Sequence, residues 1–250
     1  MAKAVFRFYE ELNDFLPPDR RKTDFTYEFN GRPGIKDAVE ALGVPHTEAD
    51  LILVNGDPVD FSYRLEEGDR VSVYPVFESF DISGTSLNRP RPLREPRFIL
   101  DVHLGTLARK LRLLGFDTLY RTDYDDEEIA DAASREGRIV LTRDTGLLKR
   151  KAVSRGYWLR NTDPDLQIEE IVRRFQLENL IRPFERCPTC NGSIREVPKE
   201  EIAHLLEPKT RKYYTRFFRC TECGQIYWRG SHYSRILEQI DRLKNRDKGA

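Results

Sequence analysis

The chain has 250 residues, of which 39% are hydrophobic and 34% charged, and its formal net charge is zero. This length allows one large domain or two to three small ones, and no apolar run is long enough to span a bilayer. Because residues 1–8 follow a strand pattern rather than that of a signal peptide, we expect a cytoplasmic protein that does not enter a membrane.

The zero net charge hides an asymmetry along the chain. Residues 1–85 carry 9 basic and 17 acidic side chains, whereas residues 86–250 carry 33 basic and 25 acidic ones. Arginine supplies 31 of the 42 basic residues, and its planar guanidinium suits bidentate contacts to phosphate. We therefore expect a polyanion partner for the basic part, although an arginine-rich composition bias explains the same numbers.

The first module spans residues 1–82. Residue patterns predict strands at residues 3–9, 23–29, 51–54, 59–61 and 70–74, with helices at 10–16 and 34–42. Together with the Asn55-Gly56 turn and the Glu67-Gly68-Asp69 stretch, this order resembles the ubiquitin-like β-grasp domains of small sulfur carriers.

The end of this module departs from the sulfur carriers. Those proteins end in an exposed Gly-Gly whose carboxylate is activated, but here the chain continues through residues 76–80. We therefore expect the module to dock a protein partner or present a substrate, with a sulfur-carrier-like adaptor as an alternative. Residues 83–96 are rich in Pro and Arg and predict a basic linker.

The second module, residues 97–181, alternates strands with helices. Strands are expected at Phe98–Leu100 and at residues 118–120, 139–141 and 157–159, with helices near residues 104–114, 129–136, 146–152 and 165–175. This alternation predicts a parallel sheet with helices on both faces. Ligands of such sheets bind at the carboxyl ends of the strands.

Three aspartates are expected to converge at that edge. Asp101 directly follows the first strand, Asp144 comes just past the third, and Asp126 heads the preceding helix. Carboxylates from separate elements suit Mg²⁺ or Mn²⁺, which can activate a water for phosphodiester cleavage. Asp126 and Asp144 are equally well explained as helix N-caps, whereas a carboxylate at the buried strand end of Asp101 needs a partner or a metal.

The only four cysteines form two C-x-x-C pairs, Cys187/Cys190 and Cys220/Cys223. Two such pairs supply the four thiolates of one tetrahedral structural zinc, which has no open position for substrate. Disulfides or a redox pair are the alternative, which the expected cytoplasmic location disfavours.

The segment between the two cysteine pairs interleaves basic and aromatic residues, a pattern typical of proteins that bind single-stranded nucleic acid. Packing of Tyr214 and Phe218 in the core of the ribbon is the structural alternative. His232, after the second pair, is equally compatible with a contact to phosphate and with a structural role. The RNA-contact candidates are Arg211, Lys212, Tyr213, Arg216, Arg219 and His232.

Residues 98–117, 126–129 and 137–144 resemble the PIN-like ribonuclease domain found at the C-terminus of the mutator-seven exonuclease. In that family a four-cysteine zinc ribbon follows the PIN-like fold, and some members carry a ubiquitin-like domain in front. The resemblance implies a metal-dependent ribonuclease with Asp101, Asp126 and Asp144 at the acidic positions. It also implies an α/β chain with an N-terminal β-grasp domain, a central PIN-like domain and a C-terminal zinc ribbon over residues 182–250.

The expected function is therefore cleavage of RNA at the aspartate cluster, with Asp101 and Asp144 holding Mg²⁺ or Mn²⁺. Two alternatives remain at this point, a non-catalytic RNA-binding accessory protein and the sulfur-carrier-like adaptor. A nuclease that acts on DNA is a variant of the expected function, because the sequence does not reveal contacts to the 2′-OH.

Overall fold

The computed structural model describes residues 1–75 and 96–245. Within these, the chain forms two compact units, one built from residues 1–75 and 125–159 and the other from residues 96–124 and 160–245. Residues 83–95 of the expected linker, and the expected boundary at residue 82, lie outside the described residues.

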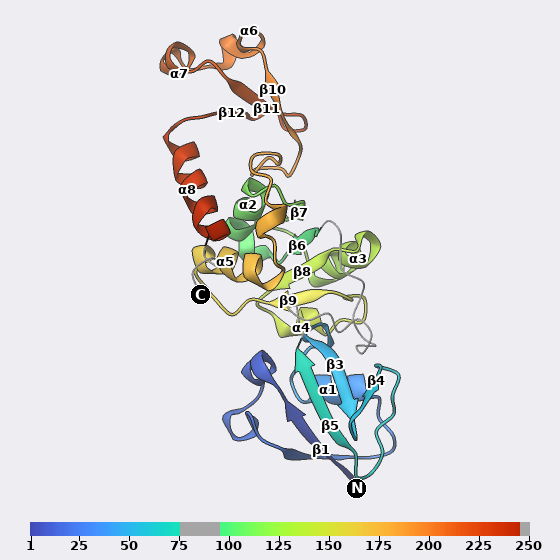
Figure 1. Cartoon of the computed structure of the whole chain (residues 1–250). Coiled ribbons are helices and arrows are strands. Elements are labelled where there is room, and N and C mark those ends of the chain that lie inside the picture. Colours follow the sequence, from blue (N-terminus) through green and yellow to red (C-terminus); the bar gives the residue numbers. More distant parts are fainter. Residues whose placement is uncertain (76–95, 246–250) are drawn as a thin grey trace. The chain divides into compact units, whose positions relative to one another are not determined.

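The N-terminal module is a five-stranded mixed sheet with the order β2-β1-β5-β3-β4 (Figure 1). β1 pairs in parallel with β5, whereas the β1–β2, β3–β5 and β3–β4 pairs are antiparallel. This is the β-grasp arrangement that the sequence predicted. The elements are β1 (Ala2–Phe8), β2 (Phe25–Phe29), α1 (Ile35–Ala41), β3 (Ala49–Val54), β4 (Asp57–Val59) and β5 (Arg70–Pro75), with 3₁₀ helices η1 (Glu10–Phe15), η2 (Pro18–Arg20) and η3 (His46–Glu48).

The buried side chains of this module are explained by the two-residue repeat of a β-strand and the 3.6-residue repeat of an α-helix. Every second residue of a strand points to the same face, so Phe6 and Phe8 of β1 are buried together. Ile35 and Val39 of α1, four residues apart, lie on one helix face and are buried in the same cluster. Burial of each such side chain contributes roughly 1.5–3 kcal/mol.

The central domain contains a parallel sheet with the strand order β7-β6-β8-β9, in which β6 pairs with β7 and β8 with β9. Every residue of β6 and β8 is buried, as expected for parallel strands covered on both faces. The elements are β6 (Phe98–Leu100), η4 (Val102–Leu104), α2 (Gly105–Leu113), β7 (Thr118–Leu119), α3 (Asp126–Glu136), β8 (Ile139–Thr142), α4 (Thr145–Leu148), β9 (Gly156–Trp158), α5 (Pro164–Arg174) and η5 (Glu178–Leu180).

The C-terminal module is a three-stranded antiparallel sheet of order β10-β11-β12, followed by a long helix. We call residues 182–230 of this module the four-cysteine ribbon. The elements are β10 (Ile194–Val197), α6 (Lys199–Ile202), η6 (Ala203–Leu205), α7 (Pro208–Tyr213), β11 (Phe217–Cys220), β12 (Ile226–Trp228) and α8 (Ser231–Asn245).

Several elements differ from the sequence prediction in helix type or in their end residues. Residues 10–15 form a 3₁₀ helix rather than an α-helix, and α4 ends at Leu148 rather than near residue 152. Segment ends depend on backbone hydrogen bonds, which hydrophobic periodicity does not report.

Candidate functional site

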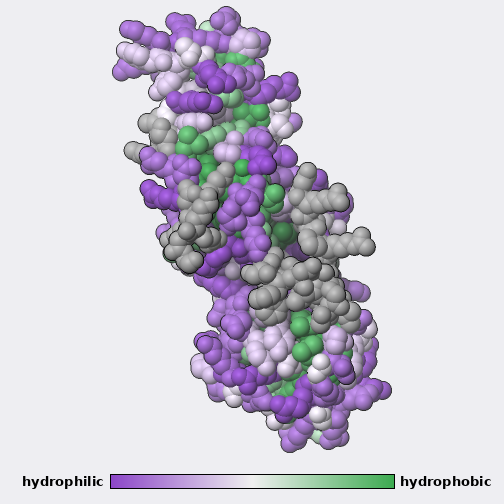
Figure 2. Space-filling model, in the orientation of Figure 1, coloured by the Kyte–Doolittle hydropathy of each residue, from purple (hydrophilic) through white to green (hydrophobic). Residues whose placement is uncertain are grey.

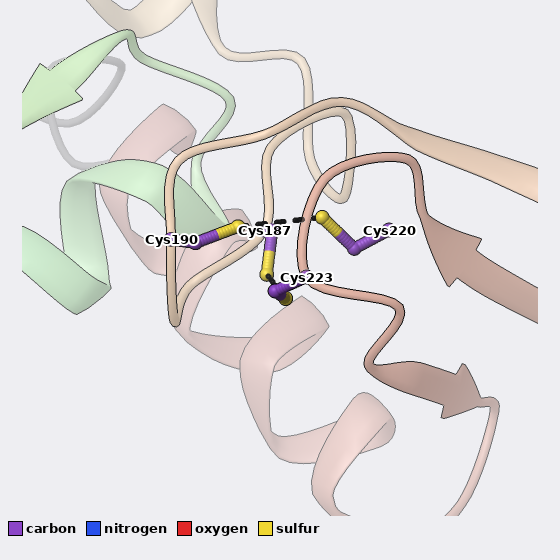
Figure 3. A group of neighbouring side chains, drawn as sticks. All are labelled: Cys187, Cys190, Cys220 and Cys223. Carbon is purple, nitrogen blue, oxygen red and sulfur yellow. Dashed lines mark hydrogen bonds between the residues drawn. The ribbon is translucent and has the colours of Figure 1, made fainter.

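The four cysteines lie together at the tips of two loops, one before β10 and one at the end of β11 (Figure 3). Their sulfurs are all within 4.8 Å of one another; the Cys190 and Cys220 sulfurs are 3.4 Å apart, and those of Cys187 and Cys223 are 3.7 Å apart. Four sulfurs placed about 2.3 Å from a tetrahedral metal are about 3.8 Å apart. The spacing is that of a four-thiolate metal site, and all four cysteines are free rather than joined in disulfides.

Backbone geometry shapes each cysteine loop. The nitrogens of Gly192 and Glu222 donate to the sulfurs of Cys190 and Cys220, both at 3.4 Å. A Cβ at Gly192 would come within 2.4 Å of the Glu222 side chain and 2.9 Å of the Cys220 sulfur. Glycine is therefore needed for the two loops to approach each other.

The first cysteine loop is anchored to the central domain through Arg112 of α2. The Arg112 side chain is buried and donates to the backbone oxygens of Thr118, Pro188 and Thr189 at 2.9–3.2 Å. Burial lowers the pKa of Arg112, while negative charge on the nearby sulfurs of Cys187 and Cys190 opposes that shift. A fixed guanidinium fork thus joins the cysteine loop to β7.

Asn191 provides a second anchor for the same loop. Its Oδ1 accepts from the backbone nitrogen of Thr118 at 3.0 Å, and its Nδ2 donates to Asp117 at 2.8 Å. Asn191 has a φ of 70°, a left-handed conformation that Asn tolerates better than most residues. No sequence motif predicted these two contacts, because Arg112 and Thr189, and likewise Asn191 and Asp117, are more than 70 residues apart in the chain.

Asp144 lies two residues past the end of β8 and is the N-cap of α4. Its Oδ1 accepts from the nitrogen of Gly146 at 2.7 Å, and its own nitrogen donates to the hydroxyl of Thr142 at 2.9 Å. The capping alternative for Asp144 is therefore confirmed, and one carboxylate oxygen is engaged in it.

Asp126 is not a cap. The N-cap of α3 is Asp125, whose side chain forms a capping box with Glu128. The capping explanation for Asp126 is therefore wrong. Asp126 is the first residue of α3, and its Oδ2 lies 3.3 Å from Arg150, with both side chains more than 40% exposed.

Asp101 directly follows β6 and precedes η4, with a partly buried side chain. It belongs to the unit of residues 96–124 and 160–245, whereas Asp126 and Asp144 belong to the other. Each aspartate thus has the position relative to its own strand or helix that the sequence predicted.

The basic and aromatic candidates of the ribbon divide into two groups. Arg211, Lys212 and Tyr213 lie on α7 and are exposed, with Tyr213 at 69%. Arg216 instead makes a bidentate ion pair with Glu196 at 2.7–2.8 Å, and Arg219 donates to the oxygen of Gly224. His232 lies on α8, and its side chain is outside the described residues.

One exposed aromatic residue of the ribbon was not among the residues that the sequence singled out. Trp228, the last residue of β12, is 39% exposed and lies 6.2 Å from the ring of Tyr214. Only its position after the second cysteine pair could have drawn attention to it, because a tryptophan that ends a strand is usually part of a core.

The β-grasp module packs against the α4–β9 segment within its unit. His46 is buried and makes hydrogen bonds to the Glu40 carboxylate at 2.6 Å and to the carbonyl of Val153 at 2.9 Å. Lys149 donates to the oxygen of Glu40, and the rings of Phe15 and Trp158 lie 5.1 Å apart. Burial lowers the pKa of His46, and Lys36 adds to that shift, while Glu40 opposes it.

Comparison with protein families decides the relationship of this chain to known proteins. Residues 96–240 match the Mut7-C RNAse domain, which is more than half of the chain. The chain belongs to the Mut7-C RNAse family. Residues 1–81 match the Mut7-C ubiquitin domain, so this member carries the ubiquitin-like module in front of the RNAse domain, in the predicted order. The match supports a ribonuclease-type enzyme.

Two crystal structures of small archaeal modifier protein 1 from Haloferax volcanii are similar to part of the chain, at 15% and 14% identity. They cover 31% and 32% of this chain and 100% of their own, each with a TM-score of 0.26. Comparison with curated proteins gave no match. Within residues 1–75 and 96–245, no helix has both the length and the apolar character needed to span a membrane.

Proposed function

We propose that this Mut7-C RNAse family protein is a metal-dependent ribonuclease that cleaves phosphodiester bonds of single-stranded or structured RNA at Asp101, Asp126 and Asp144. The family match over residues 96–240 carries the proposal. Asp101 follows β6 and Asp144 follows β8, and the carboxyl ends of parallel strands are where such sheets bind their ligands.

The aspartates suit a hard divalent cation. The N-cap hydrogen bond of Asp144 involves Oδ1, which leaves Oδ2 to serve as a ligand. Asp126 is partly exposed, and its contact to Arg150 is long enough to rearrange at little cost. Asp101 and Asp144 would hold Mg²⁺ or Mn²⁺, and Asp126 would complete the acidic cluster. When bound, the ion would activate a water and stabilise the leaving oxygen of the phosphodiester.

The chain's own groups then have separate tasks. The α4 N-cap holds Asp144 in one rotamer, so that its second oxygen keeps a constant direction. Arg150, beside Asp126, supplies a positive charge that can contact a phosphate of the substrate. The exposed basic residues of α7 hold the RNA through its backbone.

We assign a structural zinc to the four cysteines. Their spacing fits the ion, and a closed four-thiolate set has no position for substrate. The purified protein should contain one zinc per chain by mass spectrometry of the metal, and Cys223→Ser should contain less. Full zinc retention in Cys223→Ser would contradict the assignment.

Cleavage of labelled single-stranded RNA and tRNA, with Mg²⁺, Mn²⁺ or EDTA, tests the nuclease. Asp144→Asn is the decisive variant because Asn also caps helices, so the substitution keeps the cap and removes the charge. We expect cleavage only with metal ions and a loss of at least about 100-fold in Asp144→Asn. Asp131→Asn, which changes the same charge on the exposed side of α3, should cleave normally.

One observation favours a second candidate, an RNA-binding accessory protein without catalysis. The cap of α4 and the Asp126–Arg150 pair give two of the three aspartates structural roles. RNA binding by the parent protein and by Asp144→Asn, with no cleavage in any metal, would establish this candidate. Equal cleavage of DNA of the same sequence would instead show that the 2′-OH is not recognised.

A further inference from the structure

A groove of about 310 Å³ lies on the four-cysteine ribbon, beside the second cysteine pair. The segment that leads into α7 forms one wall, and β12 with the turn before it forms the other. Its lining includes Leu205, Glu207, Thr210, Gly224, Gln225 and Trp228.

Two large side chains in this lining are exposed, Leu205 at 54% and Trp228 at 39%. The ribbon elements at the top of Figure 2 are otherwise covered mainly by hydrophilic side chains. Single exposed apolar residues are ordinary on protein surfaces, but two that line the same hollow are typical of a binding site.

The indole of Trp228 is held in position from one side. Tyr214 lies 6.2 Å from it, ring to ring, and a Cβ at Gly230 would lie 3.2 Å from the indole nitrogen. Close packing of this kind restricts the rotamers of the indole before any ligand binds. A positioned aromatic ring with an exposed part is a surface on which a flat, unsaturated ring can stack.

The helix that contributes Thr210 to the groove also carries positive charge. Lys209, Arg211 and Lys212 of α7 are exposed, and within the described parts of the chain no carboxylate pairs with them. Arg216 differs, because Glu196 neutralises it in a bidentate pair. The charge beside the groove is therefore available to an anion that follows α7.

The polar groups within the groove suit the edge of a base rather than a phosphate. Glu207 is the carboxylate of the lining and would repel a phosphate, but it can accept from an amino group of a base. Gln225 offers both a donor and an acceptor. An apolar stacking surface, polar groups for a base edge and cations alongside together match one unpaired nucleotide and its neighbours.

We propose that this groove binds an unpaired base of single-stranded RNA, with Trp228 stacking on the base and the basic residues of α7 contacting the flanking phosphates. The identity of the polyanion rests on the proposed function, and the groove defines its substrate class as RNA with an unpaired stretch. Bases within a duplex are stacked on one another, so they do not reach such a surface.

Binding of a mixed-sequence 12-nucleotide RNA tests the proposal. The parent protein for these measurements carries Asp144→Asn, and no divalent cations are added, so that cleavage does not interfere. Trp228 is one of only two tryptophans, and stacking should quench its fluorescence. By fluorescence anisotropy, Trp228→Ala should weaken binding about 5- to 100-fold, the range for loss of one stacked base. Trp228→Phe, which keeps an aromatic ring, should retain most of the affinity.

A charge-matched pair of variants tests the phosphate contacts. Lys212→Gln should reduce the slope of log K against log salt by about 0.7, whereas Arg216→Gln should leave it nearly unchanged because Arg216 is already paired. Unchanged circular dichroism and zinc content will show that each variant is folded.

Equal affinity of Trp228→Ala and its parent for the 12-mer would overturn the proposal, and would be the result if the groove takes an acidic protein segment instead. Binding of a duplex as tight as that of the single strand would also overturn it. Cleavage of RNA without any involvement of Trp228 would leave the proposed ribonuclease standing. RNA binding that depends on Trp228, without any cleavage, would support the proposed groove and contradict the proposed ribonuclease.

Discussion

Glu48 of the β-grasp module accepts a hydrogen bond at 2.6 Å from the backbone nitrogen of Trp158, the last residue of β9. The indole nitrogen of Trp158 donates in turn to the carbonyl of Arg143 at 3.1 Å, directly before Asp144. The β-grasp module is therefore hydrogen-bonded to the strand beside the loop that carries Asp144. It is part of the support of that loop rather than a separate appendage.

Removal of the Glu48 side chain should destabilise the protein. Glu48 is completely buried, and Glu48→Ala leaves the Trp158 N–H without its acceptor, at a cost of about 2 kcal/mol in free energy of unfolding. Urea unfolding followed by circular dichroism measures the change. Glu67→Ala, at an exposed position of the same module, should alter the free energy by less than about 0.5 kcal/mol. Equal effects of the two substitutions would contradict this role of Glu48.

His46 should make the protein less stable in mild acid. Burial lowers its pKa below the ordinary value of 6.5, so the unfolded chain takes up a proton that the folded protein resists. The stability that neutral His46 contributes is present above pH 6.5 and is lost as the pH falls from there towards the folded pKa. Urea midpoints at about pH 7.5 and 5.5 should therefore differ less in His46→Gln than in the parent protein. His204→Gln, at an exposed histidine, should keep the parent's pH dependence.

Gly115→Ala should be strongly destabilising. Gly115 has a φ of +97°, and an added Cβ would lie 2.1 Å from the backbone oxygen of Arg182. We expect a loss of at least about 2 kcal/mol, from the left-handed backbone and the clash together. Gly31→Ala measures the effect of the left-handed backbone alone, because Gly31 has a φ of +67° and an added Cβ there would have no atom within 4 Å. This substitution should cost about 1 kcal/mol in free energy of unfolding. Similar thermal shifts for the two variants would argue against the clash.

Arg112→Lys should loosen the attachment of the first cysteine loop. Lysine keeps the charge but cannot reproduce the planar fork that reaches Thr118, Pro188 and Thr189. We expect a loss of about 1–3 kcal/mol in unfolding free energy and faster release of zinc to a coloured chelator. Arg109→Lys, on the exposed side of α2, provides the comparison. Unchanged zinc release in Arg112→Lys would show that the loop holds its geometry without this contact.

Local sequence patterns predicted the helices and strands well where hydrophobic periodicity or a terminating glycine was clear. The strands at Phe98–Leu100 and Arg70–Pro75 and the helix that ends at Gly137 were expected from periodicity and from glycine as a helix terminator. The assignment of helix caps was less secure. Asp125 and Asp126 are adjacent and chemically identical, and only the direction in which the helix begins decides which of them accepts the N–H of Glu128.

In the candidate site, too, some features could be predicted from local sequence patterns and others could not. Spacing alone identified the four cysteines, because two C-x-x-C pairs leave few other arrangements for thiolates. The basic residues of the ribbon looked equivalent in the sequence. Folding separates them, since antiparallel pairing of β10 with β11 brings Glu196 to Arg216 and leaves Lys212 on α7.

Properties that depend on neighbouring residues could therefore be predicted from the sequence. They are the order of the modules, the alternation of strands and helices, the cysteine pairs, and the positions of Asp101 and Asp144 after their strands. Properties that depend on distant residues needed the folded molecule. Glu48 meets Trp158 across 110 positions, and Asn191 meets Asp117 across 74. Hydrophobic periodicity carries no information about such polar contacts, because each is satisfied only after packing has brought its two partners together.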